Sequence, residues 1–148
     1  MIAEPAVNLS AELRRLLGPD RVLDAHSDLA VFECDAFVIE KHCPNVAVFP
    51  QTTSEVAAVV KLCNKRGVPF VPRGADTSLA GGGLPVGGGV MIVLTRMRTI
   101  LEVNLRDRYA VVEPGVVNGS LNKRLAGTGN HYAPDPSSQL ACMIGGNV

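Results

Sequence analysis

The sequence lacks the features that mark several large protein classes. Its 14 basic and 14 acidic residues cancel, so charge gives no reason to expect a nucleic-acid partner or an acidic membrane surface. No run of 18 apolar residues occurs, so no transmembrane segment is predicted. The N-terminal stretch MIAEPAVNLS has neither the basic nor the apolar region of a signal peptide. We therefore expect a cytoplasmic protein.

Metal-binding patterns are absent as well. The four cysteines form no CxxC pair, and no second ligand pair accompanies the adjacent His42 and Cys43 at the spacing of a zinc site. No metal site is predicted. Without an export signal, we expect reduced thiols, several of them buried, at Cys34, Cys43, Cys63 and Cys142.

The composition that is present indicates a folded domain. The chain has 148 residues, 47% of them apolar and 19% charged, which is enough for a hydrophobic core. We expect a helical or extended N-terminal segment over residues 1–44 and the main domain over residues 45–148. The final stretch begins what resembles another site of close backbone approach, at Gly145-Gly146-Asn147. We therefore expect the chain to be the N-terminal part of a longer protein.

The best-defined stretch is a β-α-β unit. An apolar strand is predicted at 46–49, followed by Thr52-Thr-Ser-Glu55, a capping box that begins a helix. Gly67 is suited to ending this helix, and a second strand follows at 68–72. The two strands are predicted to be parallel with a right-handed crossover.

The flanking regions contain shorter elements. Ser10 is a candidate N-cap for a helix that Gly18 ends, and residues 21–35 are ambiguous between a strand at 22–23 and a helical turn capped by Ser27. The later predicted elements are a buried strand at 90–94, a hairpin of 98–103 and 109–112, a helix at 118–126 and a proline-rich loop at 131–141.

A loop with seven glycines, from Gly74 to Gly89, separates two of the predicted strands. A flexible linker would be richer in serine and polar residues, so simple flexibility is the less favoured interpretation. A P-loop is excluded because no lysine lies between Arg66 and Lys123. A Rossmann fingerprint is excluded because the GxGxxG spacing is absent and a strand follows the loop.

The remaining interpretation is a phosphate-binding nest made by the loop backbone. Successive N–H groups in a tight glycine loop form a concavity that binds anions, and missing side chains let a pyrophosphate approach. Arg73 at the loop entry would add charge or be structural, and Thr77 and Ser78 offer hydroxyls. The loop therefore predicts a dinucleotide that is not held in Rossmann fashion.

Three motifs in order resemble the FAD-linked oxidases of the vanillyl-alcohol oxidase type, whose cofactor domain is called PCMH-type. The motifs are Pro72-Arg-Gly-Ala-Asp-Thr-Ser-Leu-Ala-Gly-Gly82, Tyr132-Ala-Pro-Asp-Pro-Ser-Ser-Gln139 and Cys142-Met-Ile-Gly-Gly-Asn147. Within that family, the chain is most similar to a subunit of glycolate oxidase and to D-lactate dehydrogenases. The resemblance extends over nearly the whole chain and includes Pro50-x-Thr-x-x-Glu55-Val.

The resemblance implies an α+β, two-lobed FAD-binding domain whose first lobe holds a small parallel sheet with helices and whose second lobe is only partly present. FAD would lie between the lobes. The residues implied to wrap its pyrophosphate follow Arg73 and are Gly74, Ala75, Asp76, Thr77 and Ser78, continued by Gly82 and Gly83. Those implied to line the flavin are Pro134, Asp135, Ser138, Gly145 and Gly146.

The glycine loop departs from the family pattern at two positions. The family usually has Gly or Asn where this chain has Asp76, and Gly where it has Ser78. A carboxylate beside a pyrophosphate is unfavourable unless it points away or meets a cation, and serine must tolerate the local φ. Some relatives attach the flavin through a histidine that corresponds to Thr77, so the FAD is expected to be non-covalent.

The resemblance also implies oxidation of a 2-hydroxy acid, such as glycolate or D-lactate, by hydride transfer to FAD. Substrate and metal ligands of relatives lie in a downstream domain that is absent here, so we predict no catalytic residue. His26, His42 and His131 are expected to be surface or loop residues. Other oxidase subunits are implied as partners, through which the protein would lie peripherally at a membrane. The alternative is a stand-alone fragment without catalysis, either a binding module or a remnant.

Overall fold

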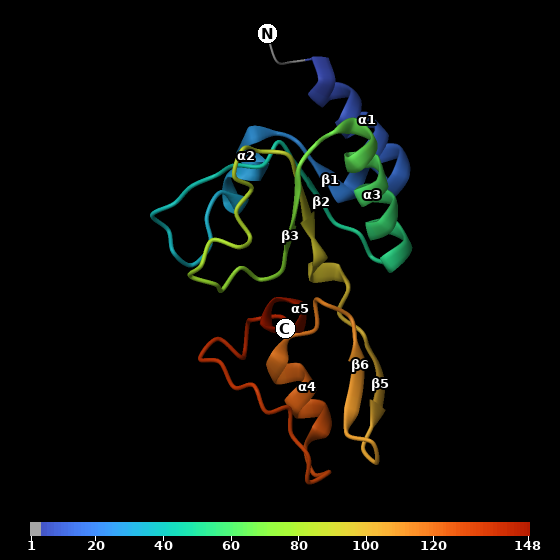
Figure 1. Cartoon of the computed structure of the whole chain (residues 1–148), viewed down its shortest axis with the longest axis vertical. Coiled ribbons are helices and arrows are strands. Elements are labelled where there is room, and N and C mark those ends of the chain that lie inside the picture. The colour runs from blue at the N-terminus through green and yellow to red at the C-terminus, as the bar shows by residue number, and fades with distance from the viewer. Residues whose placement is uncertain (1–3) are drawn as a thin grey trace.

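The structure is a computed structural model that describes residues 4–148 and has two lobes, one above the other in Figure 1. The upper lobe precedes the lower one in the sequence, and a short connector at residues 94–99 joins them. The upper lobe contains α1 (Glu4–Leu17), η1 (Pro19–Arg21), β1 (Val22–Leu23), α2 (His26–Leu29), η2 (Ala30–Phe32), β2 (Val46–Val48), α3 (Thr53–Arg66), β3 (Phe70–Arg73) and β4 (Val90–Val93). The lower lobe contains β5 (Ile100–Asn104), β6 (Tyr109–Val112), α4 (Asn118–Leu125) and α5 (Ile144–Asn147), after η3 (Leu94–Arg96) in the connector.

The upper lobe is built on a four-stranded sheet in the order β1-β2-β4-β3. Both β2 and β3 are parallel to β4, which lies between them, and β1 is antiparallel to β2. The predicted β-α-β unit is therefore present as β2, α3 and β3. Its two strands are not neighbours, because β4, which comes later in the sequence, lies between them. The mixed α+β architecture agrees with the predicted fold class.

Alternation along β2 and β4 gives the sheet two buried faces. Val46, Val48, Val90 and Ile92 pack with α1 and α3 on one face. The alternate residues of the two strands, Ala47, Met91 and Val93, pack on the other face with Leu29, Phe32 and Phe49. Helices and loops on both sides therefore exclude water from the central strands.

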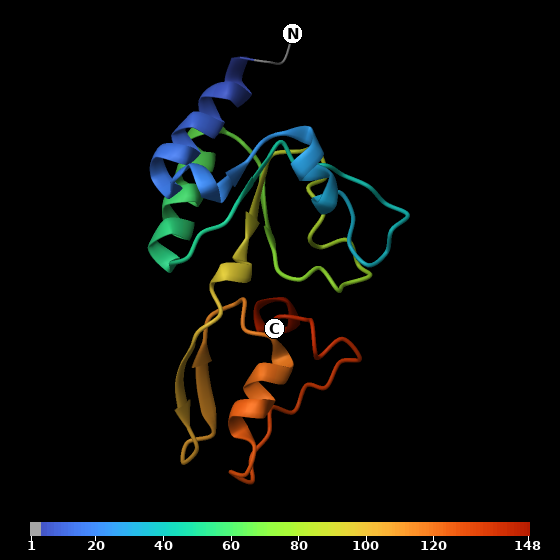
Figure 2. The same cartoon turned by 180° about the vertical axis from the view of Figure 1, so that it is seen from behind.

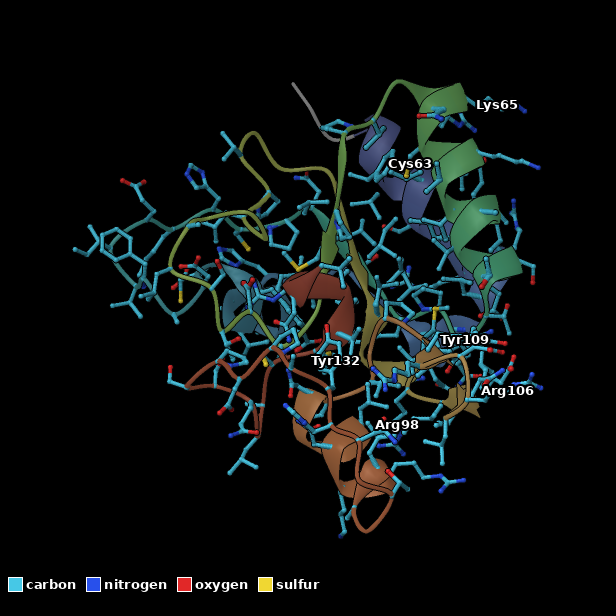
Figure 3. All side chains as sticks on the ribbon, turned by 60° about the horizontal axis from the view of Figure 1, so that its bottom comes forward. Cys63, Lys65, Arg98, Arg106, Tyr109 and Tyr132 are labelled. Atoms are coloured by element: carbon cyan, nitrogen blue, oxygen red, sulfur yellow. The ribbon has the colours of Figure 1, made fainter. Side chains whose placement is uncertain are left out.

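Helix α1 begins earlier than the sequence predicted. Ser10, the candidate N-cap, lies inside the helix and is buried, so that assignment was wrong. Leu13 and Leu17 on the same helix are buried in the core, as expected from their spacing. Cys63 lies between α1 and α3, whereas Lys65 points outward from the end of α3 (Figure 3).

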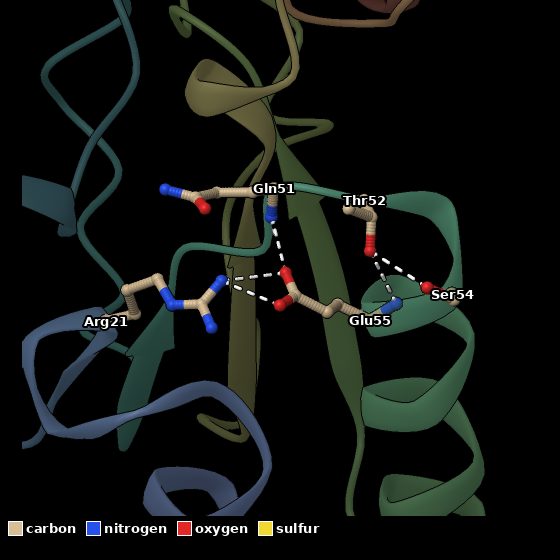
Figure 4. Close-up of polar contacts among 5 residues, drawn as sticks. All are labelled: Arg21, Gln51, Thr52, Ser54 and Glu55. Carbon is tan, nitrogen blue, oxygen red and sulfur yellow. Dashed lines mark hydrogen bonds and ion pairs between the residues drawn. The ribbon is translucent and has the colours of Figure 1, made fainter.

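Helix α3 begins and ends where its local sequence predicts. The Thr52 hydroxyl accepts a hydrogen bond of 3.2 Å from the Glu55 N–H, and Gly67 takes the left-handed conformation with φ 62°. The Glu55 carboxylate accepts from the Gln51 N–H at 2.7 Å and from the Arg21 guanidinium at 2.8 Å (Figure 4). Glu55 thereby also ties α3 to Arg21, which directly precedes β1.

The lower lobe is smaller. Strands β5 and β6 form the predicted antiparallel hairpin, and α4 packs beside it around a core of Val116, Leu121, Leu125 and Ile144. The connector is braced where Gly115 donates to the Met97 carbonyl at 2.7 Å. A side chain at Gly115 would collide with the carbonyls of Leu94 and Met97. Across residues 4–148, no helix is both long and apolar enough to cross a membrane.

Candidate functional site

A cavity of about 290 Å³ lies between the lobes, with the glycine loop (residues 74–89) on one side and the start of α5 on the other. In Figure 1 the loop descends from β3 toward α5. The cavity brings together most of the predicted cofactor residues, namely Arg73, Gly74, Ala75, Asp76, Thr77, Ser78, Gly82, Gly83, Gly145 and Gly146. Segments about 70 residues apart in sequence, 74–78 and 145–146, thus form one site.

Three predicted residues do not line this cavity: Pro134, Asp135 and Ser138. They belong to the loop that leads into α5. Asn118 holds this loop, because its side-chain amide donates to the Pro134 carbonyl at 3.1 Å and its backbone N–H donates to the Cys142 carbonyl at 3.0 Å. The loop therefore supports α5 from behind the cavity wall.

At two positions in the cavity wall, the fold does not require a glycine. A Cβ built at Gly82 or at Gly146 would meet no protein atom within 4 Å, and neither residue has a left-handed φ. Alanine or a larger residue would fit both positions of the isolated chain. Open space beside them, one position in each lobe, is what a ligand that approaches the backbone would need.

The neighbouring glycines have structural roles instead. A Cβ at Gly83 would collide with the Asp76 carboxylate, and one at Gly145 would lie 2.6 Å from the Pro114 side chain. At Gly74, a Cβ would make an ordinary contact of 3.5 Å with the Met143 sulfur, so Gly74 and Met143 mark where the two lobes approach each other.

Asp76 is held in a buried ion pair. Its φ is 55°, a left-handed conformation that Asp tolerates better than most side chains. Its side chain is 7% exposed and lies 2.5 Å from the Arg73 guanidinium, although Oδ2 makes no hydrogen bond of good geometry with the described residues. Burial raises the pKa of Asp76; Arg73 opposes this rise and Asp35 adds to it. The carboxylate that would repel a pyrophosphate thus meets a cation.

The guanidinium of Arg73 is already occupied by partners within the protein. Its guanidinium donates to the carbonyls of Phe32 at 3.1 Å and Cys34 at 2.9 Å, and it lies over the Phe32 ring at 5.5 Å. Its partner Asp76 carries the opposite charge, so the two charged side chains of the cavity wall together have no net charge. Any anion bound here would therefore be held by backbone N–H groups, as in a nest.

Ser78 fits its position without strain. Among described non-glycine residues only Asp76 and Arg108 have a positive φ, so the glycine usual at position 78 is not needed for a left-handed turn. The Ser78 hydroxyl accepts from the Ala80 N–H at 3.1 Å, and its carbonyl accepts from the Ala36 N–H at 3.2 Å.

Sequence reasoning missed several cavity residues: Leu94, Pro114, Cys142, Met143 and Asn147. Cys142, Met143 and Asn147 belong to the motif that also supplied Gly145 and Gly146, so their positions beside the glycines were a usable signal. Leu94 and Pro114 come from the connector and the end of β6. Only the tertiary fold brings those two positions to the cavity.

Residues 44–148 match the family model described as "FAD binding domain". The chain belongs to this family. FAD is its cofactor. Among the residues that line the cavity, Gly82 and Gly146 leave space beside the backbone, one position in each lobe, as a group that approaches the backbone needs.

Relatives with described functions are similar over most of the chain. The glycolate oxidase subunit GlcD of Escherichia coli K12 is 41% identical over 86% of the chain and 26% of the relative. A D-lactate dehydrogenase of Anaerostipes hadrus is 38% identical over 91% of the chain and 27% of the relative. This FAD-binding domain thus spans about a quarter of the length of these proteins.

Solved structures support the two-lobed FAD-binding architecture of PCMH type. An alkyldihydroxyacetonephosphate synthase superimposes with a TM-score of 0.84 at 25% identity, over 95% of this chain and 28% of that one. A p-cresol methylhydroxylase with substrate bound gives a TM-score of 0.74 at 29% identity, over 84% of this chain and 25% of that one.

Proposed function

We propose that this FAD-binding domain serves a flavin-dependent oxidoreductase that oxidises a 2-hydroxy acid of the glycolate or D-lactate class. FAD, when bound, supplies the hydride acceptor for such a reaction. The observation that carries the proposal is the pair Gly82 and Gly146, whose missing side chains leave backbone open to a ligand from both lobes. The names of the glycolate and D-lactate relatives support the substrate class.

In this proposal the chain's own residues bind and orient the cofactor. The backbone of the glycine loop, from Gly74 through Gly83, holds the diphosphate, while the Arg73–Asp76 pair keeps the nearby side-chain charge at zero. Met143 lies beside Gly74 where the two lobes approach each other. Thr77 stands where some relatives carry the histidine that attaches the flavin, so FAD is held non-covalently.

The domain boundaries and the partners are also part of the proposal. We infer that residues 45–148 form the cofactor domain and that residues 1–44 precede it, although β1 pairs with β2 in the same sheet. Because the E. coli relative is named a subunit, we infer that other oxidase subunits are partners. Through them, a cytoplasmic protein would meet a membrane surface peripherally.

A second candidate is a module that binds FAD without catalysis. The observation that favours it is the pairing of Arg73 with Asp76, because it leaves neither charged group of the cavity placed to take a substrate proton. Because this chain by itself is expected to be inactive, the deciding experiment adds glycolate or D-lactate, without oxygen, to an FAD-loaded protein that contains this domain together with a downstream substrate domain. Bleaching of the flavin band supports oxidation, and a persistent band supports the binding module.

The test of the FAD site is Gly82→Val. A Cβ at Gly82 would meet no protein atom within 4 Å, so the fold should persist, while the added bulk at this lining position should abolish FAD retention. FAD is measured by its visible absorbance after release by denaturation, and folding by circular dichroism. Ala80→Val, in the same loop but outside the cavity wall, is the matched control and should keep its FAD. Equal FAD content in both variants would place the cofactor elsewhere.

A further inference from the structure

The segment before β2 contacts the glycine loop at its entry and at two points within it. Arg73, at the entry, donates to the carbonyls of Phe32 and Cys34. In the middle, the Ala36 N–H donates to the Ser78 carbonyl at 3.2 Å. The two segments lie side by side on the same flank of the sheet in both views (Figures 1 and 2). We call residues 32–37 the bracing segment.

Asp35 makes the last of these contacts along the loop, at Gly81. Its side chain accepts from the Gly81 N–H at 2.9 Å through one oxygen and from the Phe37 N–H at 2.8 Å through the other. The residue is 5% exposed, so both hydrogen bonds are shielded from water. One carboxylate thus fixes the bracing segment internally and fastens the loop to it.

A glycine-rich loop needs such support if it is to bind through its backbone. Glycine loses more conformational freedom on ordering than any other residue, and a ligand that must order the loop binds more weakly. The N–H groups of a nest must also point to one place. Contacts that fix the loop before the ligand arrives therefore strengthen binding without touching the ligand.

We propose that the bracing segment positions the glycine loop for the diphosphate of FAD, with Asp35 and Arg73 as the positioning residues. This proposal rests on the FAD-binding role of the cavity. Arg73, which the sequence suggested as a possible source of positive charge for the phosphates, acts through the loop instead. Asp35 lies outside all the sequence motifs and outside the cavity wall.

The test is Asp35→Asn in the full chain. Asparagine keeps one acceptor oxygen but presents an NH₂ group to the other N–H, so one of the two backbone hydrogen bonds is lost. We expect amide hydrogen exchange over residues 74–83 of the FAD-free protein to accelerate about tenfold, and the Kd for FAD to rise by about the same factor. Exchange in β2 and β4 should stay unchanged.

Glu33→Gln is the matched control. Glu33 lies in the bracing segment but pairs with Lys41 at 2.5 Å rather than with the loop. It should leave both loop exchange and the Kd for FAD unchanged. Unaltered loop exchange in Asp35→Asn would overturn the proposal, as would faster exchange with an unaltered Kd.

A second variant keeps the test decisive if Asp35→Asn fails to fold. Arg73→Lys retains a charge beside Asp76 but cannot reach both the Phe32 and Cys34 carbonyls, because a lysine has one nitrogen where arginine has a fork. It should accelerate exchange over the loop entry and raise the Kd, and an unchanged loop would overturn the proposal. If the unaltered chain binds no FAD, the proposed function fails, while the exchange data still decide whether the bracing segment holds the loop.

Discussion

The two lobes bury their strands to different extents. In the upper lobe, residues of β2 and β4 are buried on both faces of the sheet. In the lower lobe, the hairpin packs one face on α4, while Leu101, Tyr109 and Val111 remain 61%, 46% and 43% exposed. Figure 3 shows Tyr109 on the hairpin, and Tyr132 packs against the core of this lobe. An isolated two-stranded hairpin is marginally stable in water, so the lower lobe depends more on its neighbours.

The two lobes also contribute different parts of the cavity wall. The upper lobe presents a long glycine loop from a rigid sheet and braces it with a second segment. The lower lobe contributes one short helix, α5, held by the loop behind it and by Pro114. A site assembled from a rigid half and a less rigid half gains order when the ligand bridges them.

The largest expected effect concerns the two cores. Leu13→Ala in the upper lobe, at a fully buried position, should lower the free energy of unfolding by about 2–5 kcal/mol. The same truncation at Leu121, in a core with only four buried members, should fall at the lower end of that range. Urea denaturation followed by circular dichroism measures both. An equal or larger loss at Leu121 would contradict the comparison.

A smaller effect is expected from the ion pair at the start of α3. The Gln51 N–H and then Arg21 lower the pKa of Glu55 below its ordinary value of 4.5, against the opposing effect of burial. A lowered pKa in the folded state means that the stabilisation is present above pH 4.5 and is lost as the pH falls through the folded value. Glu55→Gln should therefore cost about 1–3 kcal/mol at pH 7, and this cost should shrink as the pH falls below 4.5 and through the folded pKa.

Glu102→Gln provides the matched comparison in the lower lobe. Glu102 accepts a hydrogen bond of 2.6 Å from the Tyr109 hydroxyl on the exposed face of the hairpin. Its replacement should change the free energy of unfolding by about 0.5 kcal/mol or less at pH 7. Urea titrations of both variants at pH 7 and at a pH below 4.5 test this comparison. If Glu55→Gln loses as much stability in acid as at pH 7, the assignment is disproved.

The smallest expected effect is at the exposed face of the hairpin. Leu101→Ser should change stability by no more than about 0.5 kcal/mol, because this leucine is largely in contact with water already. Thermal melts at two protein concentrations provide the measurement. A loss several times larger, or one that depends on concentration, would show that another surface covers the hairpin in solution.

Local signals in the sequence predicted the elements whose ends are set locally. Thr52, Glu55 and Gly67 defined α3 because caps act within one turn of the helix. The start of α1 was misjudged because Ser10 satisfied the same rule, whereas Pro5, near the observed start, is the better signal. The placement of β4 between β2 and β3 could not be predicted, since strand order depends on contacts across the whole lobe.

The candidate site also has parts that the sequence predicts and parts that only the tertiary fold reveals. The glycine loop and the Gly145-Gly146 pair were predicted from motifs, and the cavity contains both. The role of each glycine could not be predicted, because Gly82 and Gly83 are adjacent in sequence but face open space and Asp76 respectively. The contacts of Asp35 and Arg73 join residues about 40 positions apart, and only the tertiary fold reveals them.

The chain passes from one lobe to the other once within residues 4–148, through the connector at 94–99. Within these residues, the elements of each lobe lie on their own side of that passage. Cofactor binding and the association of the lobes are therefore two sides of one equilibrium, and thermodynamic reciprocity applies. In the proposed site, the factor by which FAD strengthens the association of the lobes equals the factor by which that association strengthens FAD binding, so the cofactor would also hold the two halves of the domain together.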